Sequence, residues 1–260
     1  MRTFTKLIGA SCKYGQRKDG VQSGATNIFK HMGVHKDVNY VSNFEGGGYQ
    51  ELFKVHNHYL TNGWKPLTVG GDHSISLATV ASSVEKYKDD LTVVWVDAHA
   101  DIHTRESSQS QNLHGMPLGS LLGHDALFNF PQIKPDQLVY IGLRDVDQYE
   151  KKVIQDLGIR HYTVADIDRY SLKSILSKLY RESTAIHLSF DIDALDPKYI
   201  SCTGTPVANG LSYQDAVEII TTLRPKIISS DIVEFNPLIG DKKQTVKEAF
   251  RIINLIKLLD

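Results

Sequence analysis

Short apolar runs alternate with amphipathic stretches along nearly the whole chain. The apolar runs are typical of strands buried on both faces of a parallel sheet, and the amphipathic stretches have the spacing of helices. We expect strands within residues 4–10, 38–44, 65–74, 93–96, 137–147, 159–167, 184–197 and 226–237. We expect helices from Ala25 onward and within residues 49–63, 74–88, 151–158, 171–182, 212–224 and 243–259. This alternation predicts one α/β domain over residues 1–260, with three layers and an open, doubly wound parallel sheet in the middle.

The composition argues against some classes of partner but does not indicate an activity. The chain has 260 residues, a formal net charge of -1, and acids and bases mixed along its length. That balance argues against nucleic acid or an anionic membrane as a partner. Only Cys12 and Cys202 are present, which suits two free thiols in a reducing compartment. No signal-peptide core and no run of transmembrane length is apparent, so we expect a cytoplasmic protein.

Polar clusters follow five of the expected strands, at the point where each strand ends. They are Gly70–His73, Asp97–Asp101, Arg144–Asp147, Asp191–Asp193 and Glu234. In open α/β sheets the ligand site lies beyond the carboxyl ends of the strands. Five strands that each end in polar residues therefore predict one shared site at that edge of the sheet.

The most concentrated cluster ends the apolar run of residues 93–96. Asp97, His99 and Asp101 stand at alternate positions, so in an extended chain their side chains leave the same face. Asp191 and Asp193 have the same spacing. For one such aspartate, a turn or helix cap is the ordinary explanation. For the set together, unpaired buried charge would be too costly, and a bound cation is the simplest remedy.

The donor types indicate which cation. With His73, the candidate set holds four aspartates and two histidines and no thiolate, which disfavours a structural zinc site. Four carboxylates balance the charge of two divalent ions. Mn²⁺ suits mixed oxygen and imidazole ligands, and Fe²⁺, Co²⁺ and Zn²⁺ remain open. A two-metal centre of this kind indicates metal-assisted hydrolysis.

A series of motifs in the same order resembles the ureohydrolase superfamily, and arginase most closely. They are GGDHS (70–74), DAHAD (97–101), NLHGMPLG (112–119), GLRDVD (142–147), SFDIDALDP (189–197), TGTP (203–206) and DIVEFNP (231–237). Residues 7–25 are also similar to the arginase N-terminus. The resemblance covers nearly the whole chain and implies the arginase-like fold.

The resemblance also implies a ligand set for two Mn²⁺ per subunit. One ion would be held by His73, Asp97, Asp101 and Asp191. The second would be held by Asp97, His99, Asp191 and Asp193, so that Asp97 and Asp191 bridge the two ions. Asp101 would also hydrogen-bond a metal-bridging hydroxide.

Further roles are implied residue by residue. His114 matches a mobile proton shuttle, and Glu234 matches the carboxylate that pairs with the substrate guanidinium. Thr205 lines the pocket, Ser110 contacts the substrate carboxylate, and Asp147 helps to recognise its α-amino group. The expected reaction converts L-arginine to L-ornithine and urea, and the expected assembly is a homo-oligomer.

One position departs from the arginase pattern. His103 stands where arginases usually have an asparagine that contacts the substrate α-carboxylate, and a histidine can donate to the same group. This leaves other ureohydrolases open, such as an agmatinase or a formimidoylglutamase. A metal-binding family member without catalysis is an alternative of another class, against which the intact His114 and Glu234 argue. A dinuclear phosphoesterase is a further alternative, but no cluster of basic residues is arranged for phosphate.

Overall fold

The computed structural model describes residues 4–260. Eight parallel strands form one sheet in the order β2-β1-β3-β8-β7-β4-β5-β6. The strands are β1 (Thr5–Ala10), β2 (Asn39–Val41), β3 (Lys65–Gly70), β4 (Leu91–Val96), β5 (Leu138–Leu143), β6 (Arg160–Thr163), β7 (Ala185–Asp191) and β8 (Ile227–Val233). The chain builds one edge with β1 to β3, crosses to build the other with β4 to β6, and returns to fill the middle with β7 and β8.

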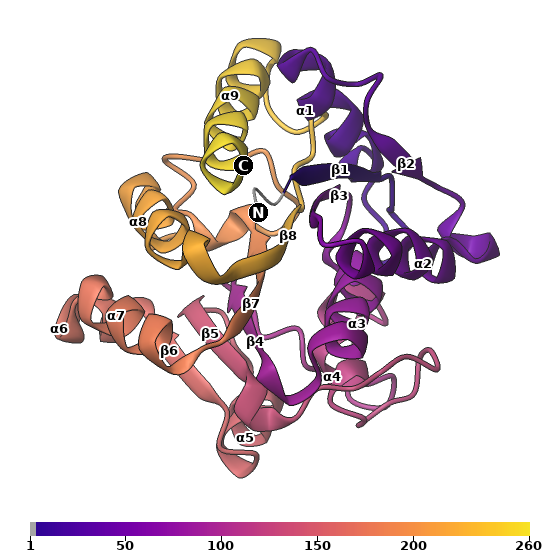
Figure 1. The fold of residues 1–260 in the computed structure, drawn as a ribbon. Helices are drawn as coiled ribbons and strands as arrows, with labels where there is room; N and C mark the ends of the chain where they lie inside the picture. Colours follow the sequence, from indigo (N-terminus) through magenta and orange to yellow (C-terminus); the bar gives the residue numbers. More distant parts are fainter. Residues whose placement is uncertain (1–3) are drawn as a thin grey trace.

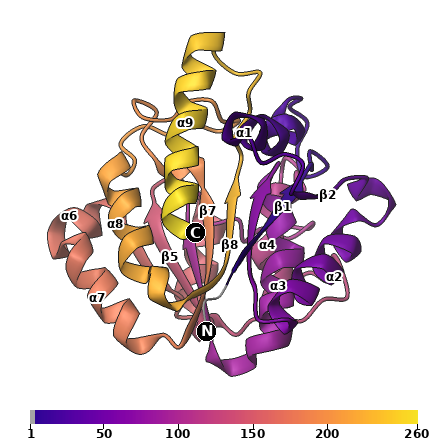
Figure 2. The same ribbon diagram turned by 45° about the horizontal axis from the view of Figure 1, so that its top comes forward.

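Helices cover both faces of the sheet, as expected (Figure 1). They are α1 (Gly24–Met32), α2 (Gly48–Thr61), α3 (Ser76–Tyr87), α4 (Pro117–Leu121), α5 (Gln148–Asp156), α6 (Val164–Tyr170), α7 (Leu172–Glu182), α8 (Tyr213–Leu223) and α9 (Lys242–Leu259). Helices α1, α9, α8, α7 and α6 follow one another across one face, and α2, α3 and α4 pack on the other (Figure 2). The predicted α/β architecture with an open parallel sheet is confirmed.

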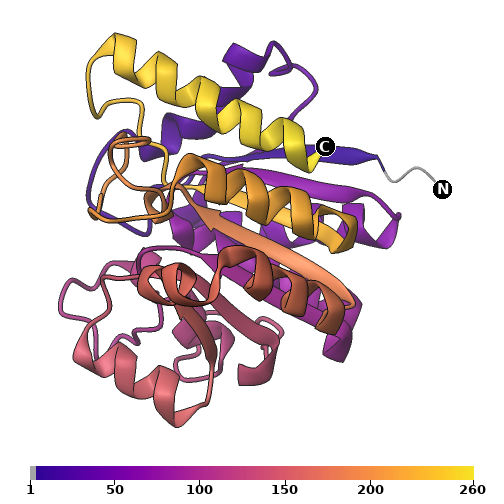
Figure 3. The same cartoon turned by 90° about the vertical axis from the view of Figure 1, so that its left-hand side faces the viewer.

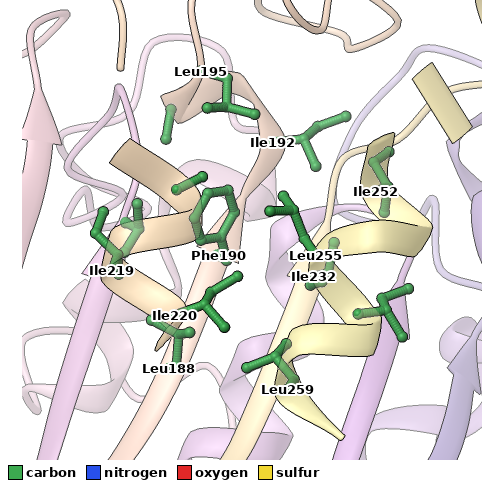
Figure 4. Packing of buried hydrophobic residues seen from close by; sticks show 14 of the residues in the cluster. Leu188, Phe190, Ile192, Leu195, Ile219, Ile220, Ile232, Ile252, Leu255 and Leu259 are labelled. Atoms are coloured by element: carbon green, nitrogen blue, oxygen red, sulfur yellow. The ribbon is translucent and has the colours of Figure 1, made fainter. Parts of the chain in front are cut away.

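The core explains why the apolar runs are continuous. Each residue of β4, β5 and β7 is buried, because helices cover both faces of these strands. On the α8 and α9 side, Phe190 of β7 and Ile232 of β8 pack against Ile220 and Leu255 (Figure 4). Burying such side chains contributes roughly 1.5–3 kcal/mol each, so this packing fixes the central strands beneath the site.

The polar clusters gather at one side of the sheet. The strands are parallel, so their carboxyl ends share an edge, and the long connecting loops lie at that edge (Figure 3). The C-terminal end of α9 lies at the opposite side. No helix in residues 4–260 is long and apolar enough to cross a membrane.

One local expectation is wrong, and one helix was not anticipated. The strand expected within residues 159–167 ends at Thr163, whose side chain accepts a hydrogen bond from the backbone N–H of Asp166 and begins α6. A capping box outweighs the strand preference of this short apolar run. Helix α4 was not expected, and it begins with Pro117 at its first position.

Candidate metal centre and substrate pocket

Three of the four central strands, β3, β4 and β7, bring the predicted metal ligands together. His73 lies in a 3₁₀ turn after β3, and Asp97, His99 and Asp101 follow β4. Asp191 ends β7. Asp193 lies in the short 3₁₀ turn that follows. Because β3, β8, β7 and β4 are neighbours in the sheet, residues distant in sequence meet beyond its centre.

The His73 imidazole marks the first candidate cation position. Its Nδ1 lies 3.0 Å from Asp97 Oδ2, 3.2 Å from Asp101 Oδ2 and 3.2 Å from Asp191 Oδ2. This nitrogen is buried and has no hydrogen-bond partner. An unpartnered nitrogen facing three carboxylate oxygens is a donor set that a divalent cation fits.

The His99 imidazole marks the second position. Its Nδ1 lies 3.2 Å from Asp193 Oδ2 and 3.5 Å from Asp97 Oδ1. Asp97 therefore turns one oxygen to each imidazole, which would allow this residue to serve both candidate cation positions. The Trp95 indole holds this carboxylate, because its Nε1 donates to Asp97 Oδ2 at 3.0 Å.

Residues 97–101 are not extended, so the condition under which Asp97, His99 and Asp101 would leave one face of a strand is not met. The chain bends after Asp97, whose Oδ1 accepts a hydrogen bond of 2.7 Å from the backbone N–H of His99. Asp101 has a φ of +51°, and Glu234 at the end of β8 has a φ of +69°. Such left-handed conformations cost roughly 1–2 kcal/mol for residues with a side chain. Strain of this kind collects at functional sites, and here it occurs at two acidic residues of the candidate site.

Burial and mutual repulsion raise the pKa values of two of the clustered aspartates. Burial and the neighbouring Asp97 raise the pKa of Asp101 to about 7. Burial and the charges of Asp193 and Asp97 raise the pKa of Asp191 well above its ordinary value. Burial alone would lower the pKa of His73, but the surrounding carboxylates outweigh it and raise this pKa well above 6.5. The cluster therefore attracts positive charge strongly, and two divalent cations would supply it.

Glu234 lies at the base of the site and is held from three directions. Its Oε1 accepts from the backbone N–H of His73 at 2.9 Å and lies 3.0 Å from His114 Nδ1. Gln16 Nε2 donates to Oε2 at 2.7 Å. Burial alone would raise the pKa of Glu234, but the bond with His114 outweighs it and lowers this pKa. Burial favours neutral His114, yet Glu234 raises the pKa of His114 to about 9.

A cavity of about 250 Å³ opens above this cluster. Its lining includes all of the predicted pocket residues except Ser110, Glu234 and the two deepest metal residues. The lining comprises His99, Asp101, His103, His114, Gly115, Asp145, Asp147, Glu150, Asp191, Asp193 and Thr205. Thr205 Oγ1 donates to Asp193 Oδ2 at 3.0 Å, which ties the TGTP segment to the cation site.

His103 and Asp147, which are expected to bind the amino-acid end of a substrate, lie at the mouth of the cavity. His103 Nε2 lies 3.0 Å from Asp147 Oδ2, and the His103 ring stacks on Tyr149. Ser110 is exposed, does not line the cavity, and has its hydroxyl 3.5 Å from the hydroxyl of Ser108 within the same loop. Of the residues expected at the amino-acid end of a substrate, His103 and Asp147 therefore meet, and Ser110 lies apart from them.

Several residues of the site have no individual role predicted from the sequence, although Asp145 belongs to the predicted cluster Arg144–Asp147. Asp145 and Glu150 line the cavity, Gln16 holds Glu234, and Ser189 lies against His73. Asp145 and Asp147 stand at alternate positions after a strand, as Asp191 and Asp193 do, and this spacing is a sequence signal that marks Asp145 as a residue of the site. No local signal marks Gln16, which lies 218 residues from its partner.

Comparison with known proteins gives a consistent result. The profile of the Arginase family matches residues 6–257. The arginase of Staphylococcus aureus is 34% identical, over 95% of this chain and 94% of its own. The crystal structure of the Bacillus subtilis arginase has a TM-score of 0.88 at 32% identity, covering 99% of this chain and 98% of that one. The Entamoeba histolytica arginase in complex with L-ornithine has a TM-score of 0.82 at 31% identity, covering 99% of both chains.

Proposed function

The chain belongs to the arginase family, and from this premise we propose that it hydrolyses the guanidinium group of L-arginine to L-ornithine and urea. Its relatives place it among hydrolases that act on a guanidino group and release urea. The observation that carries the proposal is the buried Nδ1 of His73, which has no hydrogen-bond partner and faces three carboxylate oxygens.

The cation centre would be held by the six predicted ligands. His73, Asp97, Asp101 and Asp191 would hold one ion, and Asp97, His99, Asp191 and Asp193 the other. Two Mn²⁺ ions are the proposed occupants, with Co²⁺, Fe²⁺ and Zn²⁺ as alternatives. When bound, the ions lower the pKa of water so that a strong nucleophile exists near neutral pH.

Glu234 would bind the reacting end of the substrate. Its carboxylate is buried and ionised, and a planar guanidinium pairs with a carboxylate through charge-assisted hydrogen bonds. Gln16 and the backbone N–H of His73 hold both oxygens in place, so little reorganisation is needed on binding. Asp101 would accept a hydrogen bond from the attacking water.

His114 would supply the proton that the departing amine needs. Its pKa of about 9 keeps the imidazole protonated at neutral pH, and it lines the cavity beside Glu234. A positioned acid of this kind contributes typically 10²–10⁴-fold to the rate of bond cleavage. The 3₁₀ turn Leu113–Gly115 carries His114 at the edge of the long loop that closes the site.

The amino-acid end of the substrate would lie at the mouth of the cavity. Thr205 lines the wall, Asp147 would recognise the α-amino group, and His103 and Ser110 would contact the α-carboxylate. His103 stands where arginases usually have an asparagine. Its imidazole would donate to the α-carboxylate in place of that asparagine, as a larger and ionisable group. A homo-oligomer in the cytoplasm completes the proposal, and the two buried free thiols are compatible with that compartment.

Urea release from a small substrate panel tests the proposal. Protein loaded with Mn²⁺ is assayed with L-arginine, agmatine and 4-guanidinobutyrate. The proposal expects the highest kcat/KM with arginine, and activity on agmatine without activity on arginine would contradict it in favour of an agmatinase. The Asp101→Asn variant separates catalysis from binding, because a family member that only binds metal would show no urea release in either protein.

A further inference from the structure

A line of buried polar side chains leads away from the cation centre into the apolar core. Ser189 of β7 lies with its Oγ 2.9 Å from His73 Nε2, on the side of the ring opposite the cluster of acids. Ser76 Oγ of α3 is 3.0 Å from Ser189 Oγ, and Asp231 Oδ2 of β8 is 3.1 Å from Ser76 Oγ. The side chains of Ser76, Ser189 and Asp231 are almost completely buried, so their hydrogen bonds are made within the protein, and those of Asp231 all go to Oδ2 while its Oδ1 has no partner within residues 4–260.

Asp231 is a fixed acceptor at the far end of this line. Its Oδ2 receives hydrogen bonds from Ser76 and Thr79 and lies 3.0 Å from His187 Nε2. Burial alone would raise the pKa of Asp231, but His187, His56 and the hydrogen bond from Thr79 together outweigh it and lower this pKa. The carboxylate is therefore ionised, and an ionised carboxylate only accepts hydrogen bonds.

The direction of every bond in the line follows from that acceptor. A serine hydroxyl has one proton, and Ser76 gives its proton to Asp231. Ser76 must then accept from Ser189, which uses the single proton of Ser189. Ser189 in turn must accept from His73, so Nε2 of His73 carries a proton. In the neutral ring that would bind a cation, Nδ1 is then left with the free lone pair.

We propose that Asp231 is a positioning residue that acts through Ser76 and Ser189 to fix the tautomer of His73 and present its Nδ1 to the first cation. This inference rests on the proposed cation centre. A histidine that binds metal through one nitrogen commonly donates its other N–H to an outer partner, and loss of such a partner typically weakens metal affinity 10–100-fold. Here the partner is a hydroxyl, whose direction is set by a carboxylate two hydrogen bonds further away.

The neighbours of the line hold its two ends in place. The Trp95 indole stacks on the His73 ring, with ring centres 4.0 Å apart and planes 9° apart, so the ring plane is fixed. At the other end, His187 Nδ1 lies 2.8 Å from Ser83 Oγ, which orients the imidazole that contacts Asp231. Both ends of this series of hydrogen bonds are held in place, so the acceptor at Asp231 can determine which nitrogen of His73 carries the proton.

Thr79 provides a matched control for Ser76. Both residues lie in α3, both are buried, and both donate to the same oxygen of Asp231, Thr79 at 2.6 Å. Only Ser76 continues to Ser189 and His73. Ser76→Ala and Thr79→Val each remove one donor to Asp231, but only Ser76→Ala interrupts the line.

The test is Mn²⁺ binding to metal-free protein, measured by calorimetry and by electron paramagnetic resonance. Wild type is expected to bind two ions and to show the spectrum of a coupled pair. Ser76→Ala and Asp231→Asn are expected to bind one of the two ions 10–100-fold more weakly and to show a mononuclear spectrum at one equivalent. Thr79→Val is expected to bind as wild type does.

Two results would overturn the inference. One is unchanged binding of both ions in Ser76→Ala, and the other is equal weakening in Thr79→Val, which would indicate a purely structural role for these hydroxyls. Ser76→Ala decides the question even if Asp231→Asn fails to fold.

Urea release by the wild type reports separately on the proposed function. Wild type that binds two ions without releasing urea contradicts the function and still tests the line, whereas wild type that binds no Mn²⁺ overturns both.

Discussion

His103 Nε2 lies 3.0 Å from Asp147 Oδ2 at the mouth of the cavity, and this contact joins the residues proposed to bind the α-carboxylate and the α-amino group of the substrate. Asp147 is the residue proposed to bind the α-amino group of the substrate through its carboxylate. An imidazole N–H donated to it competes with the substrate amine for the same oxygen. We therefore predict that His103 influences the preference among guanidino substrates.

Replacing His103 by asparagine is expected to favour arginine. His103→Asn removes the competitor for Asp147 and keeps an N–H donor for the α-carboxylate. We expect KM for arginine to fall several-fold, and KM for 4-guanidinobutyrate, which has no α-amino group, to change little. The ratio of kcat/KM for the two substrates is the measurement, and an unchanged ratio would show that His103 does not control the α-amino site.

Glu234→Gln is expected to remove most of the activity. The variant keeps the shape of the side chain but loses the charge that pairs with the guanidinium, a contact worth roughly 1.5–3 kcal/mol. We expect kcat/KM for arginine to fall by about 10–100-fold or more, with two cations still bound. Glu248→Gln is the matched control, because Glu248 is also buried and accepts from the backbone N–H of Cys202, away from the cavity. Full activity in Glu234→Gln would contradict the assignment.

Removal of the cations is expected to destabilise the protein. Without them the acids that surround His73 and His99 repel one another in a buried site. A ligand present at 100 times its dissociation constant stabilises the folded state by about 2.7 kcal/mol. For a chain of this size that corresponds to a rise in Tm of roughly 5–10 °C. Thermal unfolding with chelator and with Mn²⁺ measures this, and identical midpoints would argue against a cation site.

His56 is expected to make metal-free protein sensitive to acid. Its ring is buried between Ser82 and Ser229, and burial lowers the pKa of His56 from 6.5 to about 3. Below pH 6.5 the unfolded chain binds a proton that the folded chain does not. Stability therefore falls with falling pH, by about 1.4 kcal/mol per pH unit from this residue.

The check is urea denaturation of wild type and His56→Gln at pH 7 and pH 5, with chelator present. The variant should lose less stability on acidification than wild type, by about 2 kcal/mol. His124→Gln, at an exposed position, serves as the control and should follow the wild type. An equal loss in wild type and His56→Gln would show that His56 is not buried in its neutral form.

The fold and the clustering of the candidate metal ligands could be predicted because their signals are local. Apolar runs between helical stretches identify buried parallel strands, and acids at alternate positions after such runs identify a cation site. The folding of residues 97–101 could not be predicted, because the bend depends on the bond between Asp97 and the His99 backbone. Partners far apart in the chain leave no local pattern, as with Gln16 and Glu234 or Ser76 and Asp231.

The central claim is that two cations at this site allow the protein to release urea from arginine. The most direct measurement is the rate of urea release from L-arginine while Mn²⁺ is added stepwise to metal-free protein. The account predicts that the rate rises until two equivalents are bound per chain and then stays constant. A chain that binds two equivalents and releases no urea from arginine would contradict it.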